Sequence, residues 1–135
     1  MKLMETYKYL RTVLFTGATV FGLSALLLLA TPSLFNELLG IGSTPELDWA
    51  MRMIGLTLVA LAGNMMSVSL RGKDSTVRFS AQVMAVSAFG LGVLTLLIPV
   101  QTLTWFDYSY AAVGFGFSLA YLIGLYKAPK LNHKE

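Results

Sequence analysis

The sequence predicts an all-α integral membrane protein, one bundle of four transmembrane helices arranged as two helical hairpins. Four uncharged runs carry this prediction, over residues 12–36, 53–70, 79–106 and 108–126. Each can form a helix that crosses a bilayer, whose hydrocarbon core of roughly 30 Å takes about 20 residues. The composition agrees, because 56% of the residues are hydrophobic and 13% are charged, whereas typical soluble domains have about 25% charged residues.

The basic residues predict how the chain is threaded. Nine of the ten Lys and Arg residues precede the first run, separate the second from the third, or follow the fourth: Lys2, Lys8, Arg11, Arg71, Lys73, Arg78, Lys127, Lys130 and Lys134. Basic segments beside membrane spans stay in the cytoplasm. We therefore expect a multi-pass protein with both termini cytoplasmic and a single domain over residues 1–135.

The first span is expected over residues 9–30 and ends before Pro32, which lacks the amide needed to continue the helix. Its apolar stretch is longer than the about 7–15 residues of a signal peptide, so we expect the span to be retained. Residues 32–39 are expected to form a short helix, capped by Thr31 and ended by Gly40. Two interpretations of this segment stay open, a helix on the outer membrane surface and an ordered loop packed over the bundle.

The second span is expected over residues 46–70. Ser43 and Glu46 fit a capping box, in which each side chain bonds a backbone amide at the start of the helix. Asp48 and Arg52 are four residues apart on the same helix face, so we expect an ion pair at the outer rim. Binding of an anionic lipid head group by Arg52 is the alternative.

The third and fourth spans are expected over residues 76–98 and 109–127. Residues 21–29 and 89–97, in the first and third spans, match at six of nine positions. Because these two spans run in the same direction, the match supports two related hairpins.

Three polar residues within the spans form the candidate site: Asn64, Gln82 and Tyr121. Their distances from the nearest basic residues place them in the cytoplasmic half of the bundle. Polar groups inside a membrane mark binding sites or hydrogen bonds between helices. Both interpretations of this predicted cluster stay open.

Small residues recur every four positions along the fourth span: Ala112, Gly116, Ala120 and Gly124. Such a stripe lets another helix approach closely. The neighbouring helix can belong to the same chain or to another one.

The residue types argue against several chemistries. The chain contains no cysteine, its one histidine is His133 near the end, and the four uncharged runs hold no ionisable acid or base. Thiolate metal sites, paired histidine ligands and buried acid–base pairs therefore have no candidates. We expect no metal, no cofactor, no nucleic-acid partner and a protein that is not an enzyme.

Two short motifs resemble a known family. Pro32-x-Leu34 with Leu38-Leu39-Gly40, and Arg52-x-x-Gly55 with Gly63 further on, look like the DoxX-like small four-helix membrane proteins of bacteria. The resemblance implies a bacterial inner (plasma) membrane protein. Some members are associated with membrane redox complexes, but this chain lacks the cysteines and redox ligands for that chemistry.

The leading functional hypothesis is a non-enzymatic helical subunit or lipid-interacting membrane protein. Its expected partners are the lipid bilayer and either a second copy of the chain or another membrane-complex subunit. The alternative is a small carrier or binder of an apolar molecule, a quinone or a lipid, that uses Asn64, Gln82 and Tyr121.

Overall fold

The computed structural model describes residues 2–100 and 102–128, with side chains from Tyr7 onward. These residues form five helices: α1 (Lys2–Ala30), α2 (Pro32–Leu39), α3 (Pro45–Arg71), α4 (Asp74–Leu96) and α5 (Trp105–Lys127). Four segments are long and apolar enough to cross a membrane: Tyr7–Ala30, Pro45–Arg71, Asp74–Leu96 and Trp105–Lys127. The predicted all-α, four-span architecture is confirmed.

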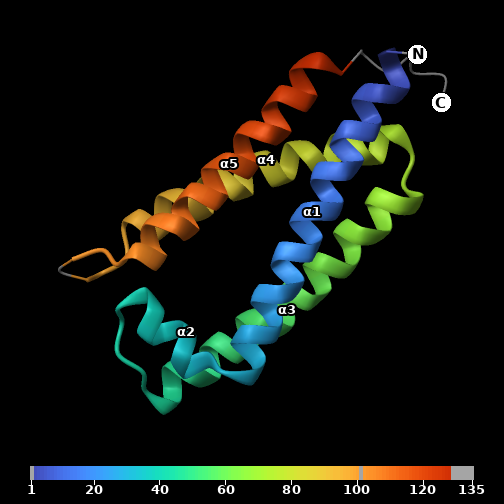
Figure 1. Cartoon of the computed structure of the whole chain (residues 1–135). Helices are drawn as coiled ribbons and strands as arrows, with labels where there is room; N and C mark the ends of the chain where they lie inside the picture. The colour runs from blue at the N-terminus through green and yellow to red at the C-terminus, as the bar shows by residue number, and fades with distance from the viewer. Residues whose placement is uncertain (1, 101, 129–135) are drawn as a thin grey trace.

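The helices pair as two hairpins (Figure 1). Helix α1 packs along α3, and α4 packs along α5, while α1 also touches α4 and α5 between the two pairs. The start of α1, the α3–α4 turn and the end of α5 lie at one end of the bundle, which we call the terminal end. Helix α2 and the α4–α5 connection lie at the other, the distal end. The predicted hairpin pairing is therefore confirmed.

Two helix starts differ from the predicted boundaries by four residues or more. Helix α1 begins at Lys2, well before the predicted residue 9, and α5 begins at Trp105, four residues before the predicted start. A capping box explains the early start of α5, because the Thr104 hydroxyl accepts from Asp107 N at 3.2 Å and Asp107 Oδ2 accepts from Thr104 N at 2.9 Å. This Thr-x-x-Asp pattern was visible in the sequence.

The predicted cap of α3 is wrong, whereas the two predicted caps of α2 are confirmed. The N-cap of α3 is Thr44, whose hydroxyl accepts from Leu47 N at 3.1 Å. Ser43 lies one residue before this cap, and its hydroxyl donates to Asp48 Oδ1 at 2.6 Å. Thr31 is the N-cap of α2 as predicted, but its side chain makes no capping hydrogen bond, and its hydroxyl donates to Leu27 O at 3.1 Å. At the other end of α2, Gly40 adopts the left-handed conformation, φ 82°, and ends the helix as predicted.

Helix α2 packs over the distal end of the bundle. It buries Pro32, Phe35, Asn36 and Leu39. The Phe35 ring meets Phe106 edge-on at 5.5 Å between centroids. The segment is therefore a helix, as the first interpretation predicted, and it packs over the bundle, as the second predicted.

Small residues bring α4 and α5 together. A Cβ at Gly114 would lie 3.0 Å from Ala88 O and 3.1 Å from Gly92 N, so the two backbones are in contact there. One turn further along α5 from that contact, the Ser118 hydroxyl donates to Ala85 O at 2.8 Å. Close backbone approach through small residues is the usual packing mode of helices in membranes.

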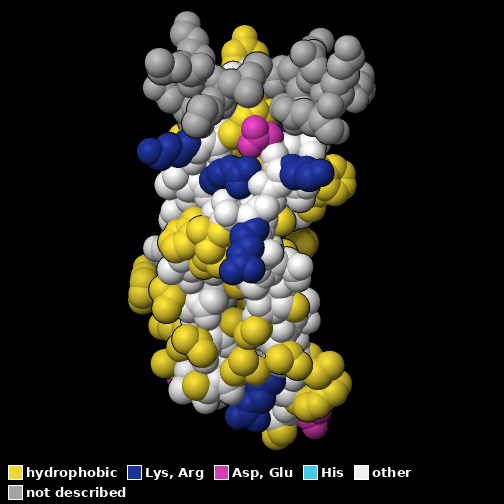
Figure 2. All heavy atoms as spheres, turned by 90° about the vertical axis from the view of Figure 1, so that its right-hand side faces the viewer, with side chains coloured by type: hydrophobic (Ala, Val, Ile, Leu, Met, Phe, Trp, Pro, Cys, Tyr) yellow, Lys and Arg dark blue, Asp and Glu magenta, His cyan; other side chains and the backbone are white. Residues whose placement is uncertain are grey.

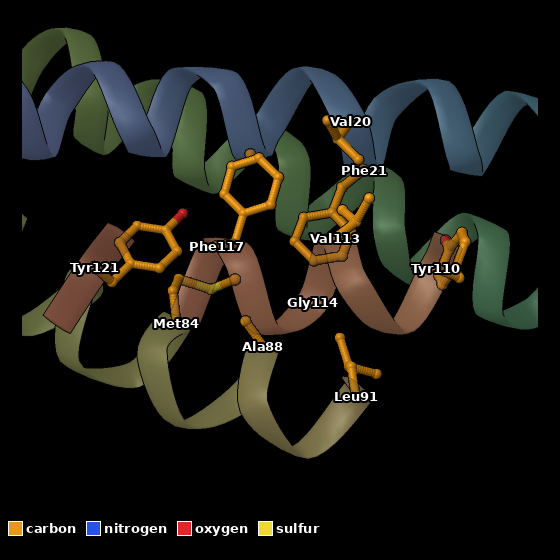
Figure 3. A pocket seen from close by; sticks show the side chains of 11 residues that line it. Val20, Phe21, Met84, Ala88, Leu91, Tyr110, Val113, Gly114, Phe117 and Tyr121 are labelled. Atoms are coloured by element: carbon orange, nitrogen blue, oxygen red, sulfur yellow. The ribbon is translucent and has the colours of Figure 1, made fainter. Parts of the chain in front are cut away.

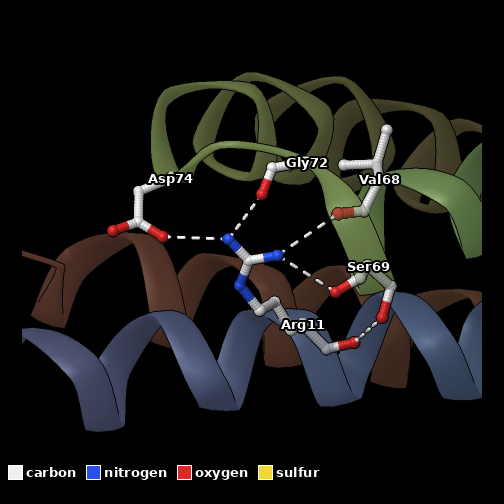
Figure 4. Close-up of polar contacts among 5 residues, drawn as sticks. All are labelled: Arg11, Val68, Ser69, Gly72 and Asp74. Carbon is white, nitrogen blue, oxygen red and sulfur yellow. Dashed lines mark hydrogen bonds and ion pairs between the residues drawn. The ribbon is translucent and has the colours of Figure 1, made fainter. Parts of the chain in front are cut away.

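A guanidinium group ties the hairpins together at the terminal end (Figure 4). Arg11 Nη2 on α1 donates to Gly72 O at 2.6 Å and to Asp74 Oδ1 at 3.0 Å, while Nη1 donates to Ser69 O at 3.1 Å and to Val68 O at 3.4 Å. In return, the Ser69 hydroxyl donates to Arg11 O at 2.7 Å. Arg11 therefore bonds three carbonyls at the end of α3 and the first residue of α4.

The surface divides by chemistry along the bundle axis. Figure 2 shows Lys and Arg side chains gathered mainly toward the terminal end, and hydrophobic side chains over much of the remaining face. Exposed hydrophobic residues include Leu56, Val86, Leu119 and Leu122 within the four spans. An apolar belt of this kind is the surface that a bilayer covers.

Candidate functional site

The predicted cluster of Asn64, Gln82 and Tyr121 does not assemble. Asn64 is exposed, and its Nδ2 donates to Ala60 O of its own helix at 2.8 Å. Gln82 is also exposed, whereas Tyr121 is buried with 1% of its surface accessible. Consecutive residues of a helix point in directions about 100° apart. Met65 and Ala81 are buried, so the adjacent Asn64 and Gln82 point away from the core.

The predicted ion pair between Asp48 and Arg52 is absent among the described residues. Asp48 Oδ1 instead accepts from Asn36 Nδ2 at 3.0 Å and from the Ser43 hydroxyl at 2.6 Å. Arg52 Nε points to Leu29 O at 3.4 Å. The carboxylate is thus held by neutral donors from α2 and the loop before α3, which leaves Arg52 on the exposed surface.

The predicted stripe on α5 divides into two halves. Ala120 and Gly124 face α1, where Ala120 O accepts from the Tyr9 hydroxyl at 3.1 Å and Gly124 packs directly against Tyr9 and Leu10. Ala112 and Gly116 are exposed, and no atom lies within 4 Å of a Cβ built on Gly116. Because a step of four residues rotates about 40° past a full turn, the stripe winds off the contact face.

A central cavity lies between the two hairpins (Figure 3). Its volume is about 50 Å³, and α1, α4 and α5 supply its walls. Three of its wall residues are small: Gly17, Ala88 and Gly114. The remaining wall residues are aromatic or aliphatic: Val20, Phe21, Met84, Leu91, Tyr110, Val113, Phe117 and Tyr121.

A larger side groove adjoins the central cavity toward the distal end. Its volume is about 260 Å³, and it shares Phe21, Leu91 and Tyr110 with the central cavity. Helix α2 contributes Phe35 and Leu39, and the other walls come from α1, α3 and α4 and the residues that follow α4: Leu28, Met51, Ile54, Leu58, Leu94, Thr95 and Ile98.

The side groove opens on the apolar belt. Leu94 is 66% exposed and Ile54 is 48% exposed, although both line the groove and both belong to predicted membrane spans. A molecule dissolved in the hydrocarbon layer therefore reaches the groove sideways, without crossing the polar ends of the bundle.

Two tyrosine hydroxyls mark the ends of the central cavity. At the distal side, the Tyr110 hydroxyl donates to Ser24 Oγ at 3.1 Å and links α5 to α1. At the terminal side, the Tyr121 hydroxyl is buried and forms no hydrogen bond with the part of the chain that the structure describes. The polar content of the cavity is therefore small and localised, as is typical of sites for apolar ligands.

The distal end holds a separate buried polar layer that the sequence did not reveal. Asn36 and Asp107 are both 0% exposed. Each keeps one side-chain bond, Asn36 to Asp48 and Asp107 to Thr104 N, and each leaves its Oδ1 unpaired among described atoms. The Asn36 bond links α2 to α3, and the Thr104 hydroxyl, held in the same capping box as Asp107, donates to Leu38 O at 2.8 Å and links the start of α5 to α2.

The walls of the central cavity and side groove are mostly apolar. No group of three His, Cys, Asp or Glu residues is placed to hold a metal within residues 2–100 and 102–128. The described walls of the central cavity and side groove carry no charged side chain.

Compared with known proteins, the chain matches no protein-family profile, no curated protein and no solved structure.

Proposed function

We propose that this protein is a non-enzymatic, lipid-interacting membrane protein that holds one apolar molecule between its two hairpins. The observation that carries the proposal is the central cavity between α1, α4 and α5, continued by the side groove, to which α2 and α3 also contribute apolar walls. Binding sites of helix bundles lie between helices and are mostly apolar with a few polar groups. A lipid acyl chain or a similarly slender apolar molecule fits this chemistry.

The binding hypothesis now rests on a different set of residues. The sequence suggested Asn64, Gln82 and Tyr121, of which Tyr121 alone reaches the cavity. The volumes also favour a slender ligand, since about 50 Å³ in the central cavity is below the roughly 150 Å³ of an engineered cavity that binds benzene. The wider part of any ligand therefore belongs in the side groove.

We also propose that the terminal end faces the cytoplasm of a bacterial inner membrane. The described basic residues at this end are Lys8, Arg11, Arg71, Lys73, Arg78 and Lys127, whereas the distal end carries Arg52 with four acidic residues. The charge bias supports this orientation, and the resemblance to DoxX-like proteins supports the bacterial membrane. Single cysteines introduced at Ser75 and Ser43 test the orientation by their labelling from either side of sealed vesicles.

Native mass spectrometry of the gently extracted protein tests the proposed function. We expect a bound apolar molecule on the wild type. Most of it should be lost in Val20→Phe, because the larger side chain fills part of the central cavity. Val86→Phe is the matched control, because Val86 is 75% exposed and lies outside both cavities. Equal occupancy in the two variants, or no bound molecule on a folded wild type, would contradict the proposal.

A role as a helical subunit is the second candidate. It is favoured by the outward-facing Ala112 and Gly116, since a Cβ on Gly116 meets no atom within 4 Å. Such a surface accepts a helix from a second copy or from another membrane protein. Gly116→Cys should then give a disulfide-linked dimer or adduct in native membranes, and a strictly monomeric product would count against the subunit role.

A further inference from the structure

We propose that the Tyr121 hydroxyl recognises an oxygen atom at the buried end of the ligand, so that the ligand is a neutral apolar molecule with a carbonyl or ether oxygen. This inference rests on the proposed function and specifies which apolar molecules the cavity prefers. It assigns to Tyr121 the role of hydrogen-bond donor at the closed end of the central cavity.

The surroundings of this hydroxyl are apolar. It lies 2.9 Å from the Cβ position of Gly17, and the methyl group of Met65 lies 3.0 Å from the same point. The Tyr121 ring stacks beside Phe117 at 6.3 Å between centroids, and Figure 3 shows both rings on the same wall of the cavity. No described atom of the protein accepts a hydrogen bond from this hydroxyl.

Packing alone does not account for a hydroxyl in this place. A phenylalanine would fill the same volume without a buried donor that lacks an acceptor, and such a donor costs stability. The chain does use phenylalanine one turn away, at Phe117. The other cavity tyrosine, Tyr110, has a partner inside the protein, because its hydroxyl donates to Ser24 Oγ at 3.1 Å.

The chemistry of the walls selects the ligand class. The described cavity walls hold no charged side chain, so an anionic or cationic end group would be buried without a partner. A neutral carbonyl or ether oxygen needs one donor, which Tyr121 provides. Met65 and Met84 flank this end of the cavity, and their flexible thioether side chains can move to admit the oxygen.

A pair of probes that differ only in one oxygen tests the inference. A long-chain methyl ketone and the alkane of the same chain length are each added to purified protein in micelles. Occupancy is measured by native mass spectrometry for the wild type, Tyr121→Phe and Tyr110→Phe. Comparing variants with each probe cancels the different partitioning of the two probes into the micelle.

We expect Tyr121→Phe to weaken ketone binding about tenfold, the factor for one hydrogen bond of about 1.4 kcal/mol, and to leave alkane binding unchanged. Tyr110→Phe should change binding of the two probes equally. The infrared carbonyl band of an isotope-labelled ketone provides a second measurement. Its hydrogen-bonded component should be present with the wild type and Tyr110→Phe and absent with Tyr121→Phe.

The outcomes separate this inference from the proposed function. If both probes bind and Tyr121→Phe affects them equally, the hydroxyl is not the recognition donor and the inference is overturned, while the proposed function stands. If neither probe binds the folded wild type, both are overturned. Unchanged alkane binding by Tyr121→Phe also shows that the variant has kept its fold.

Discussion

The contact between α4 and α5 makes a quantitative prediction for two glycines of the same helix. At Gly114 an added methyl group would meet Ala88 O at 3.0 Å and the backbone nitrogen of Gly92 at 3.1 Å. Backbone cannot move aside as a side-chain tip can, so Gly114→Ala must push the helices apart. Overpacking of this kind costs about 1–3 kcal/mol. At Gly116 the same methyl group meets nothing within 4 Å.

The comparison isolates packing from helix propensity. Each substitution replaces glycine by alanine inside α5, and each therefore gains about 0.5–1 kcal/mol of intrinsic helix stability. That gain cancels in the difference, so Gly114→Ala should be less stable than Gly116→Ala by about 1–3 kcal/mol. The free energy of unfolding in mixed micelles titrated with a denaturing detergent measures both. Equal stability of the two variants would refute the close approach of α4 and α5.

Three further predictions concern other parts of the bundle. Gly55→Ala places a methyl group 3.1 Å from Leu28 Cβ on α1, whereas the methyl group of Gly63→Ala meets nothing within 4 Å. The free energy of unfolding should therefore be lower for Gly55→Ala than for Gly63→Ala. Similar values would contradict the α1–α3 packing. Arg11→Lys should lower the free energy of unfolding by about 1–2 kcal/mol, because an ammonium group cannot reach Ser69 O, Gly72 O and Asp74 at once. The partial exposure of the pair keeps the effect small. An unchanged unfolding curve would show that these contacts contribute nothing. Asn64→Leu and Gln82→Leu should have additive effects on stability, since both side chains are exposed on different helices, whereas a coupling energy would indicate that the polar cluster forms after all.

The spans and their pairing could be predicted because they depend on local properties of the chain. Uncharged runs separated by charged segments show how many spans there are and where each one lies, although the helices extend beyond the runs at several ends. Short connections then make successive spans antiparallel neighbours. The start of α5 was missed although its capping box, Thr104 with Asp107, is a local signal as well.

Whether the predicted site residues face one another depends on the rotation of each helix about its axis. The depth of a residue in the membrane does not determine this rotation. Asn64 was expected to face inward because polar groups usually do so in membranes. Gly55 and Met65 instead turn the opposite face of α3 toward the bundle, since small and flexible residues allow the closest packing there. The cavity escaped prediction for a related reason, because its walls come from three helices whose relative rotation the sequence does not determine.

Photo-crosslinking with a neutral long-chain ketone that carries a photoreactive group on its chain tests the central claim most directly. The labelled sites are mapped by peptide mass spectrometry on protein in native membranes. We expect Phe21, Met84 and Tyr110, which line the central cavity, to be labelled more strongly than Val86 and Leu119, which are 75% and 59% exposed. Labelling that simply follows exposure, with Val86 and Leu119 strongest and Met84 unlabelled, would contradict a binding site between the hairpins.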